Sequence, residues 1–167
     1  HLSWAIGSLA HVPLPAPLAS ALIRWFSRAY AVKLDEAEHP PHHYPSLGAF
    51  FTRNLVAGVR PIGEGVVSPV DGTLRNCGPI SDGVLEQVKG KTYTLAELLG
   101  SEADAARFRA GYYFNFYLSP PDYHHVHAPV DGSIVRVVHI PGTLWPVNDW
   151  SMNTIPKLFA VNERVVV

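Results

Sequence analysis

The stretch Ser68-Pro69-Val70-Asp71-Gly72-Thr73 has a second copy of the same pattern sixty residues later, Ala128-Pro129-Val130-Asp131-Gly132-Ser133. Asp-Gly is a favoured dipeptide of tight hairpin turns, so each copy is interpreted as a strand that ends in a turn. Two unrelated tight turns would explain either copy alone. Because the pattern occurs twice, we predict a barrel-like β domain built from pseudo-duplicated Pro-Val-Asp-Gly strand-turn units.

Short apolar runs separated by Asp-Gly, Pro-Gly or Pro-Pro turn signals continue from Val66 to the end of the chain, a pattern typical of strands. Between them, Thr94 and Glu97 have the spacing of a capping box, which predicts the start of a helix. The predicted fold class is α+β and mainly β, with helices first and the β domain after them. The predicted strands are residues 66–70, 84–88, 112–118, 134–140 and 158–167.

The part of the chain before residue 66 favours helices. An apolar stripe at helical spacing predicts an amphipathic helix that starts near Pro17, and a second short helix is predicted from Ser46. Three prolines interrupt the nearly uncharged stretch 2–23, which is therefore too short to span a membrane. The stripe, with arginines nearby, fits a helix in the lipid headgroup layer and equally a helix packed on its own domain. It consists of Leu18, Leu22, Trp25 and Phe26.

Composition excludes several classes of protein. The single cysteine, Cys77, permits neither an intrachain disulfide nor a CxxC site. Thirteen basic and fourteen acidic residues give a pI near 6.8 and no overall positive field, so nucleic acid is not an expected partner. Charged residues make up 16% of the chain, below the roughly 25% of an average soluble domain, which indicates that part of the surface is covered.

The densest polar cluster is Asp122-Tyr123-His124-His125-Val126-His127. A metal site is one interpretation, to which the histidines of residues 39–43 could add ligands, but no HExxH spacing is present. Acid-base chemistry is the other interpretation. An imidazole that acts as a base needs a carboxylate to fix its tautomer and orientation, and Asp71 and Asp131 are the candidates.

Seven blocks of this sequence together resemble the phosphatidylserine decarboxylase family. The resemblance covers essentially the whole chain, and its most specific blocks are the histidine cluster and Asn-Glu-Arg. The blocks are Tyr44-Pro-Ser-Leu-Gly-Ala-Phe-Phe-Thr-Arg53, Arg60-Pro-Ile, Ser68-Pro-Val-Asp-Gly-Thr73, Val88-Lys-Gly-Lys-Thr-Tyr93, Tyr117-Leu-Ser-Pro-Pro-Asp-Tyr-His-His-Val-His127, Pro141-Gly-Thr-Leu and Asn162-Glu-Arg.

The resemblance implies a carboxy-lyase that converts phosphatidylserine to phosphatidylethanolamine through a Schiff base on a covalent pyruvoyl group. In the family this group forms when a proenzyme cleaves itself next to the serine of a Leu-Gly-Ser-Thr motif. That motif is not present in these 167 residues. The chain is therefore expected to be most of the β-chain part of the proenzyme, cut at both ends, with the pyruvoyl-bearing α chain as its partner.

The resemblance also implies roles for individual residues. Asp71 and His127 correspond to the aspartate and histidine of the self-cleavage triad, whose serine lies outside this sequence. His124 is expected near the cofactor, where it would contact the substrate carboxylate or return a proton. Asp131 is assigned to a turn and His125 to no chemical role, and no metal is expected.

A lipid substrate favours the membrane interpretation of the apolar stripe, so all four of its residues are expected to contact the membrane. The protein is then expected to be a peripheral protein of the bacterial cell membrane, and a homo-oligomer of heterodimers is one form that it could take. The expected organisation is a membrane-facing helical segment (1–33), a Pro-rich connection with a short helix (34–65) and a catalytic β domain truncated at its C-terminus (66–167).

Two other classes of protein remain as alternatives. A duplicated Pro-Val-Asp-Gly barrel also resembles biotinyl or lipoyl carriers and sugar-phosphotransferase IIA modules. A carrier typically has its modified lysine after a methionine, but the only methionine, Met152, is followed by Asn153. A IIA module needs an isolated phospho-accepting histidine pair. The last alternative is a non-enzymatic lipid-binding β module.

Overall fold

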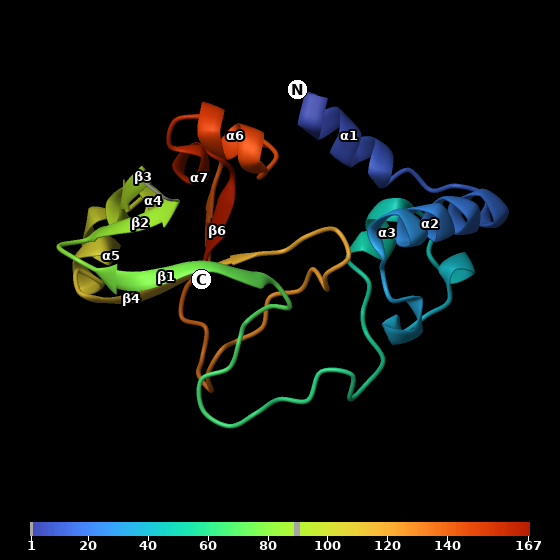
Figure 1. Cartoon of the computed structure of the whole chain (residues 1–167), viewed down its shortest axis with the longest axis horizontal. Helices are drawn as coiled ribbons and strands as arrows, with labels where there is room; N and C mark the ends of the chain where they lie inside the picture. The colour runs from blue at the N-terminus through green and yellow to red at the C-terminus, as the bar shows by residue number, and fades with distance from the viewer. Residues whose placement is uncertain (1, 89–90) are drawn as a thin grey trace. The chain divides into compact units, whose positions relative to one another are not determined.

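The structure is a computed structural model that describes residues 2–88 and 91–167, which fold into two compact units. The first unit contains the described residues up to Thr73 together with Tyr117–Gly132, and the second contains Leu74–Phe116 together with Ser133–Val167. Figure 1 shows the chain with most of its elements labelled. The elements are α1 (Leu2–Ala10), α2 (Ala16–Tyr30), the 3-10 turns η1 (Leu34–Glu36) and η2 (Pro41–His43), α3 (Leu47–Phe51), β1 (Thr73–Ile80), β2 (Val84–Val88), β3 (Lys91–Thr94), α4 (Leu95–Leu99), α5 (Glu102–Arg107), β4 (Gly111–Tyr117), β5 (Val138–Ile140), α6 (Asp149–Thr154), α7 (Leu158–Val161) and β6 (Arg164–Val166).

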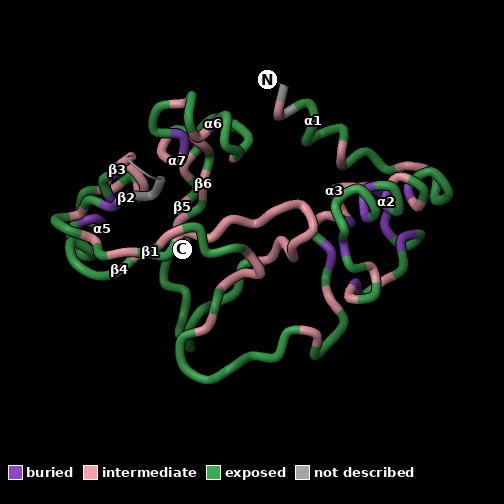
Figure 2. The backbone as a smooth tube through the Cα atoms, in the orientation of Figure 1, coloured by how far each residue is buried: buried purple, intermediate pink, exposed green. Residues whose placement is uncertain are grey.

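The predicted amphipathic helix is confirmed as α2 in the first unit. Pro15 precedes its first residue, where a missing N–H costs nothing, and Ala31 ends it in the left-handed conformation at φ 57°. The apolar spacing of the sequence places one face of α2 in the core of this unit, seen in Figure 2 as the buried positions of α2 and its neighbours. The core cluster consists of Ile23, Phe26, Val32, Tyr44 and Phe50.

The predicted short helix after Ser46 is α3. The Ser46 hydroxyl accepts a hydrogen bond from the backbone N–H of Ala49 at 3.1 Å, which caps the helix. Phe26 of α2 meets Phe50 and Phe51 edge to face, with both pairs of ring centroids 6.4 Å apart. These contacts fix α3 on α2. No helix among the described residues is both long and apolar enough to cross a bilayer.

The second unit contains three two-stranded sheets, in which β1 pairs with β4, β2 with β3 and β5 with β6. The predicted capping box is confirmed at the start of α4. The Thr94 hydroxyl accepts from the Glu97 N–H at 3.1 Å, and the Glu97 carboxylate accepts from the Thr94 N–H at 2.9 Å. The core cluster of this unit consists of Leu85, Tyr93, Leu95 and Ala105.

The described residues confirm a mixture of helices and small sheets but contain no closed barrel, because each of the sheets has only two strands. The prediction also assigned a strand to each copy of the Pro-Val-Asp-Gly pattern, and this was wrong. Residues 66–72 and 128–132 are bends and irregular chain. Each copy contains a proline, Pro69 or Pro129, whose missing N–H removes one hydrogen bond from any ladder.

Two further strand predictions were wrong in part. In the run 134–140 only Val138–Ile140 is a strand, and the run 158–167 begins as α7 before Arg164–Val166 forms β6. A short apolar run does not distinguish a buried helix from a strand by periodicity, which explains the error at α7. The runs 84–88 and 112–118 do form strands, as β2 and β4.

The Pro-Gly-Thr-Leu and Asn-Glu-Arg blocks of the sequence lie together in the second unit. The Asn162 side chain accepts hydrogen bonds from the Thr143 hydroxyl and the Trp145 N–H, at 2.9 and 3.0 Å, and donates to the Trp145 carbonyl at 2.8 Å. A Cβ at Gly142 would overlap the carbonyl oxygen of Val161 and lie 2.6 Å from the backbone nitrogen of Glu163. Only glycine fits this approach of two backbone segments.

We therefore expect Gly142→Ala to lower the free energy of unfolding by roughly 1–3 kcal/mol, the usual cost of forcing packed atoms apart. The measurement is urea or thermal unfolding followed by circular dichroism. Gly132→Ala is the matched control, because a Cβ at Gly132 meets no atom within 4 Å. Equal stability of the two variants would contradict the close approach at Gly142.

Candidate functional site

The two copies of the Pro-Val-Asp-Gly pattern lie side by side in the first unit. The Val67 N–H donates to the Pro129 carbonyl at 2.9 Å, and the His127 N–H donates to the Pro69 carbonyl at 2.8 Å. A shift of sixty residues converts the first of these hydrogen bonds into the second, so the two copies make equivalent contacts with each other. This pairing brings the segment that carries Asp71 to the end of the histidine cluster.

A cavity of about 450 Å³ lies where these segments meet. Asp71 and His127 both line it, so the structure brings two of the three predicted catalytic residues to one space, and His124 is not among the lining residues. Apolar groups and one cation make up most of the remaining wall. The lining residues are Arg60, Pro61, Ile62, Gly63, Val67, Ser68, Pro69, Val70, Asp71, Tyr123, His127 and Ala128.

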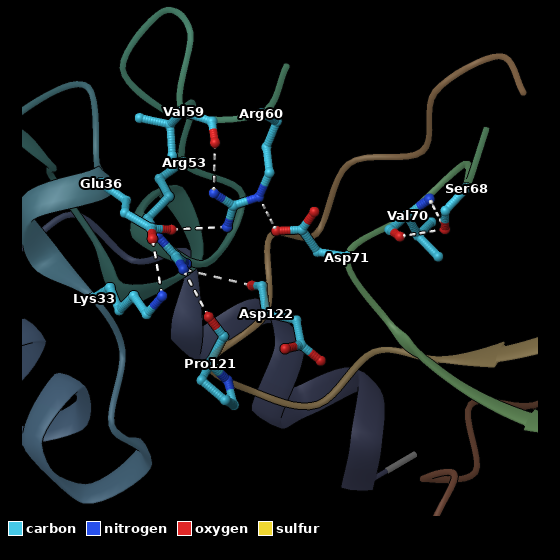
Figure 3. Close-up of polar contacts among 10 residues, drawn as sticks. All are labelled: Lys33, Glu36, Arg53, Val59, Arg60, Ser68, Val70, Asp71, Pro121 and Asp122. Carbon is cyan, nitrogen blue, oxygen red and sulfur yellow. Dashed lines mark hydrogen bonds and ion pairs between the residues drawn. The ribbon is translucent and has the colours of Figure 1, made fainter. Parts of the chain in front are cut away.

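The carboxylate of Asp71 is held by an arginine. Figure 3 shows the Arg60 guanidinium between two carboxylates, with its Nε donating to Asp71 Oδ2 at 2.6 Å and its Nη2 donating to Glu36 Oε2 at 2.7 Å. Lys33 also donates to Glu36, at 3.1 Å. Hydrogen bonds from Arg60 and Lys33 lower the pKa of Glu36, and the hydrogen bond to Glu36 raises the pKa of Arg60. The group is therefore a chain of alternating charges.

The exposed ring of His127 lies in a row of rings. Its centroid is 5.6 Å from that of Tyr123 and 6.5 Å from that of His125, and the planes are close to parallel. Within the described residues no hydrogen bond joins the His127 ring to Asp71, although both side chains line the cavity. The structure thus places an imidazole and a carboxylate at one cavity.

The C-terminal end of α3 holds the histidine cluster in three consecutive contacts. Phe51 stacks on His124 with centroids 4.0 Å apart, the Thr52 carbonyl lies 3.0 Å from His125 Nε2, and Arg53 Nη2 donates to the Pro121 carbonyl at 2.9 Å. The Phe-Phe-Thr-Arg block of the sequence therefore positions the cluster. The block belongs to the family resemblance, but its residue types alone predicted no role for it.

Arg53 is the most buried charged residue at the site. Its exposed fraction is 4%, its guanidinium lies 5.0 Å from the Phe50 ring centroid, and its Nε and Nη1 have no hydrogen-bond partner among the described residues. Burial lowers the pKa of Arg53. A second cavity of about 230 Å³ adjoins it, lined by Arg53 together with Lys33, Arg60 and the carboxylates of Glu36, Asp71 and Asp122, among others.

His124 is half-buried. Its Nε2 lies 3.0 Å from the Ser119 carbonyl, and burial lowers its pKa, which favours the neutral ring. A neutral imidazole beside a carbonyl donates from that nitrogen and keeps the other nitrogen as an acceptor. His124 is thus available as a base or as a hydrogen-bond acceptor.

The other polar candidates lie apart from this arrangement. Asp131 is exposed, and the position sixty residues after Arg60 is Pro120, so the second copy of the pattern lacks the arginine that holds Asp71. His39 and His43 stack with centroids 3.9 Å apart. Among residues 2–88 and 91–167 no group of three or more histidine, cysteine and acidic side chains has the geometry of a metal site.

The predicted membrane face of α2 is only partly exposed. Leu18 and Trp25 are 60% and 61% exposed, and Leu22 is half-buried. Phe26 is 8% exposed and belongs to the core cluster of the first unit, so its assignment to the membrane face was wrong. Phe26 follows Trp25 by one helical step of about 100°, which turns it from the exposed face towards α3.

Comparison with known proteins gives a consistent set of matches. The model of the phosphatidylserine decarboxylase family matches residues 47–167. The phosphatidylserine decarboxylase proenzyme of Myxococcus xanthus is 46% identical over 168 residues, which cover 99% of this chain and 60% of that protein. The proenzymes of Vibrio cholerae and Anaeromyxobacter are each 45% identical and are covered over 59% of their length. The chain thus spans about 60% of the length of these relatives.

Proposed function

Because this chain belongs to the phosphatidylserine decarboxylase family, we propose that it forms part of an enzyme that converts phosphatidylserine to phosphatidylethanolamine. The observation that carries the proposal is the shared cavity of Asp71 and His127. A base and a carboxylate at one cavity are the two groups that activation of a serine hydroxyl requires.

The first proposed reaction is self-cleavage of a precursor. His127 accepts the hydroxyl proton of a serine that is not among these 167 residues, while Asp71 orients the imidazole. The serine oxygen attacks the preceding peptide carbonyl, the C–N bond breaks, and the proton passes to the departing amine, which leaves an ester. Loss of the serine Cα proton then breaks the Cβ–O bond and expels the acyl group as a carboxylate, which leaves dehydroalanine. Addition of water with release of ammonia converts dehydroalanine to a pyruvoyl group.

The cavity fits a pyruvoyl group and a serine headgroup. It is about 450 Å³ in volume, and its wall combines Arg60, Asp71 and His127 with apolar side chains such as Ile62 and Val70. When bound, the pyruvoyl carbonyl supplies the electron sink that loss of carbon dioxide requires.

Two partners complete the proposal. One is the pyruvoyl-bearing α chain of the same precursor, and homo-oligomers of such heterodimers are a further level of assembly. The other is the surface of a bacterial membrane, where the substrate lies. Leu18 and Trp25, exposed on α2, support a peripheral attachment through that helix, with the half-buried Leu22 at its edge.

His124 is proposed to serve decarboxylation rather than self-cleavage, and this separation tests the function. In the full-length precursor, we expect His124→Gln to cleave normally but to produce phosphatidylethanolamine at least about a hundredfold more slowly, the usual contribution of a positioned proton carrier. Cleavage is followed on denaturing gels, and turnover by thin-layer chromatography with phosphatidylserine in detergent micelles. His125→Gln is the control and should retain both activities.

Full turnover in His124→Gln would remove His124 from the reaction. Absence of phosphatidylethanolamine production by the cleaved, unsubstituted protein would refute the decarboxylase function itself. Thermal unfolding of both histidine variants separates a chemical effect from loss of the contact between His124 and Phe51.

A further inference from the structure

Arg60 is a charged residue at the cavity with no role in the proposed reactions. All three of its nitrogens are engaged: Nε donates to Asp71 Oδ2, Nη2 to Glu36 Oε2, and Nη1 to the Val59 carbonyl at 3.2 Å. A planar guanidinium held at three points has little freedom to rotate. Arg60 therefore has a fixed position from which it can hold the Asp71 carboxylate.

Asp71 needs a side-chain contact to orient its carboxylate, because its own segment has no regular secondary structure. Residues 61–72 form no helix or strand, and a loop residue that belongs to no ladder has no backbone pattern that sets the direction of its side chain. Backbone hydrogen bonds of Val67 and Pro69, and the hydrogen bonds between Ser68 and Val70, hold the backbone that precedes Asp71. The direction of the carboxylate is set instead by the 2.6 Å hydrogen bond from Arg60.

We propose that Arg60 is a positioning residue for self-cleavage, which holds Asp71 by Oδ2 and leaves Oδ1 free to orient the imidazole of His127. The inference rests on the proposed function, because it assumes that Asp71 and His127 act together. A carboxylate has two oxygens and about four lone-pair sites, so one oxygen serves the arginine while the other serves the histidine. The ion pair with Arg60 and the orienting role of Asp71 are therefore compatible.

The anchor of Arg60 is in turn the segment directly after α2. Glu36 belongs to η1 and receives hydrogen bonds from both Lys33 and Arg60. Lys33, Glu36, Arg60 and Asp71 thus form a continuous series of opposite charges (Figure 3). Through this series the N-terminal helical region fixes the position of Asp71.

The test compares self-cleavage rates of the full-length precursor carrying Arg60→Gln, Asp71→Ala or both substitutions. Arg60→Gln is expected to slow cleavage by about tenfold to a hundredfold, the scale on which loss of orientation acts. The double variant should be no slower than Asp71→Ala alone, because Arg60 acts only through Asp71. Arg109→Gln removes an exposed arginine from the second unit and is the control, with an unchanged rate.

The pH profile of cleavage provides a readout that a purely structural role would not move. Removing Arg60 leaves the Asp71 carboxylate without its cation at the cavity that it shares with His127, so the pH at which cleavage is half-maximal should rise. The other charged groups around Asp71 and Arg60 are unchanged in this variant. They are Lys33, Glu36, Arg53 and Asp122, with His125 in the same row of rings as His127.

Arg60→Lys should restore most of the rate, since a lysine still offers one donor to Asp71. A wild-type rate and pH profile in Arg60→Gln would overturn the inference. It would also be overturned if the double variant were slower than Asp71→Ala by the same factor by which Arg60→Gln alone is slower than wild type. Normal cleavage in Asp71→Ala is a different outcome. It would overturn the assignment of Asp71 under the proposed function, and the role of Arg60 with it.

Discussion

Replacing His127 with alanine in the full-length precursor is expected to leave the precursor uncleaved, with a rate at least about a hundredfold below wild type. A serine hydroxyl is a weak nucleophile until a base accepts its proton, and His127 is the imidazole that lines the cavity with Asp71. Denaturing gels sampled over hours would show the two cleavage products in the wild type and the intact precursor in His127→Ala.

The same cleavage experiment distinguishes the two aspartates of the repeated pattern. Asp71→Ala should also slow cleavage strongly and leave most of the precursor intact over hours, whereas Asp131→Asn should cleave at the wild-type rate, because Asp131 is exposed and lacks a counterpart of Arg60. The two aspartates occupy equivalent positions in the repeated pattern, so the comparison controls for the local sequence. Normal cleavage in His127→Ala would contradict the role of His127 as the base. Loss of cleavage in a folded Asp131→Asn would contradict the choice of Asp71 over Asp131.

Helices with strong local signals could be predicted from the sequence. The stripe of α2, the Ser46 cap of α3 and the Thr94 capping box are all formed by residues within one or two turns of each other. Such signals depend only on residues in or next to the helix that they predict. The same is not true of α1, for which the sequence argument excluded a membrane span without predicting a helix.

Strand pairing was harder to predict because the partner of a strand lies far away in the sequence. The repeated Pro-Val-Asp-Gly pattern correctly drew attention to residues 67–72 and 127–132, which contact each other, but the pattern gave the wrong local conformation. A proline in each copy leaves only isolated hydrogen bonds where a ladder was expected. The repeat thus drew attention to two segments that contact each other, but it did not predict their backbone conformation.

The candidate site shows the same contrast between what local sequence predicts and what depends on contacts distant in the sequence. The residue types alone left Asp71 and Asp131 as alternative carboxylates, and the resemblance to the family selected Asp71 and His127. The structure places these two residues at one cavity. The partner of Asp71 could not be predicted, because Arg60 lies eleven residues away and Glu36 a further twenty-four from Arg60. No helical or strand periodicity relates such positions, so only the folded chain reveals the ion pairs.

Membrane attachment gives the last prediction, which depends on the exposed part of α2. Leu18 and Trp25 lie seven residues apart, and seven residues return a helix almost to the same face. Burying each side chain in the headgroup layer would contribute roughly 1.5–3 kcal/mol, whereas Arg24 and Arg28 would add about 1 kcal/mol each against anionic lipid. The apolar contribution is larger, and salt does not screen it. Binding should therefore persist at high salt.

We expect Leu18→Glu/Trp25→Glu to weaken sedimentation with phosphatidylserine-containing vesicles at least about a hundredfold, which corresponds to the loss of both burial contributions. Asn54→Glu/Ala57→Glu adds the same charge at two exposed positions outside α2 and should bind normally. Because the core of the first unit uses Ile23 and Phe26, the double substitution on the exposed face should leave the melting temperature nearly unchanged. Retained vesicle binding together with a large drop in melting temperature would assign Leu18 and Trp25 to packing within the protein instead.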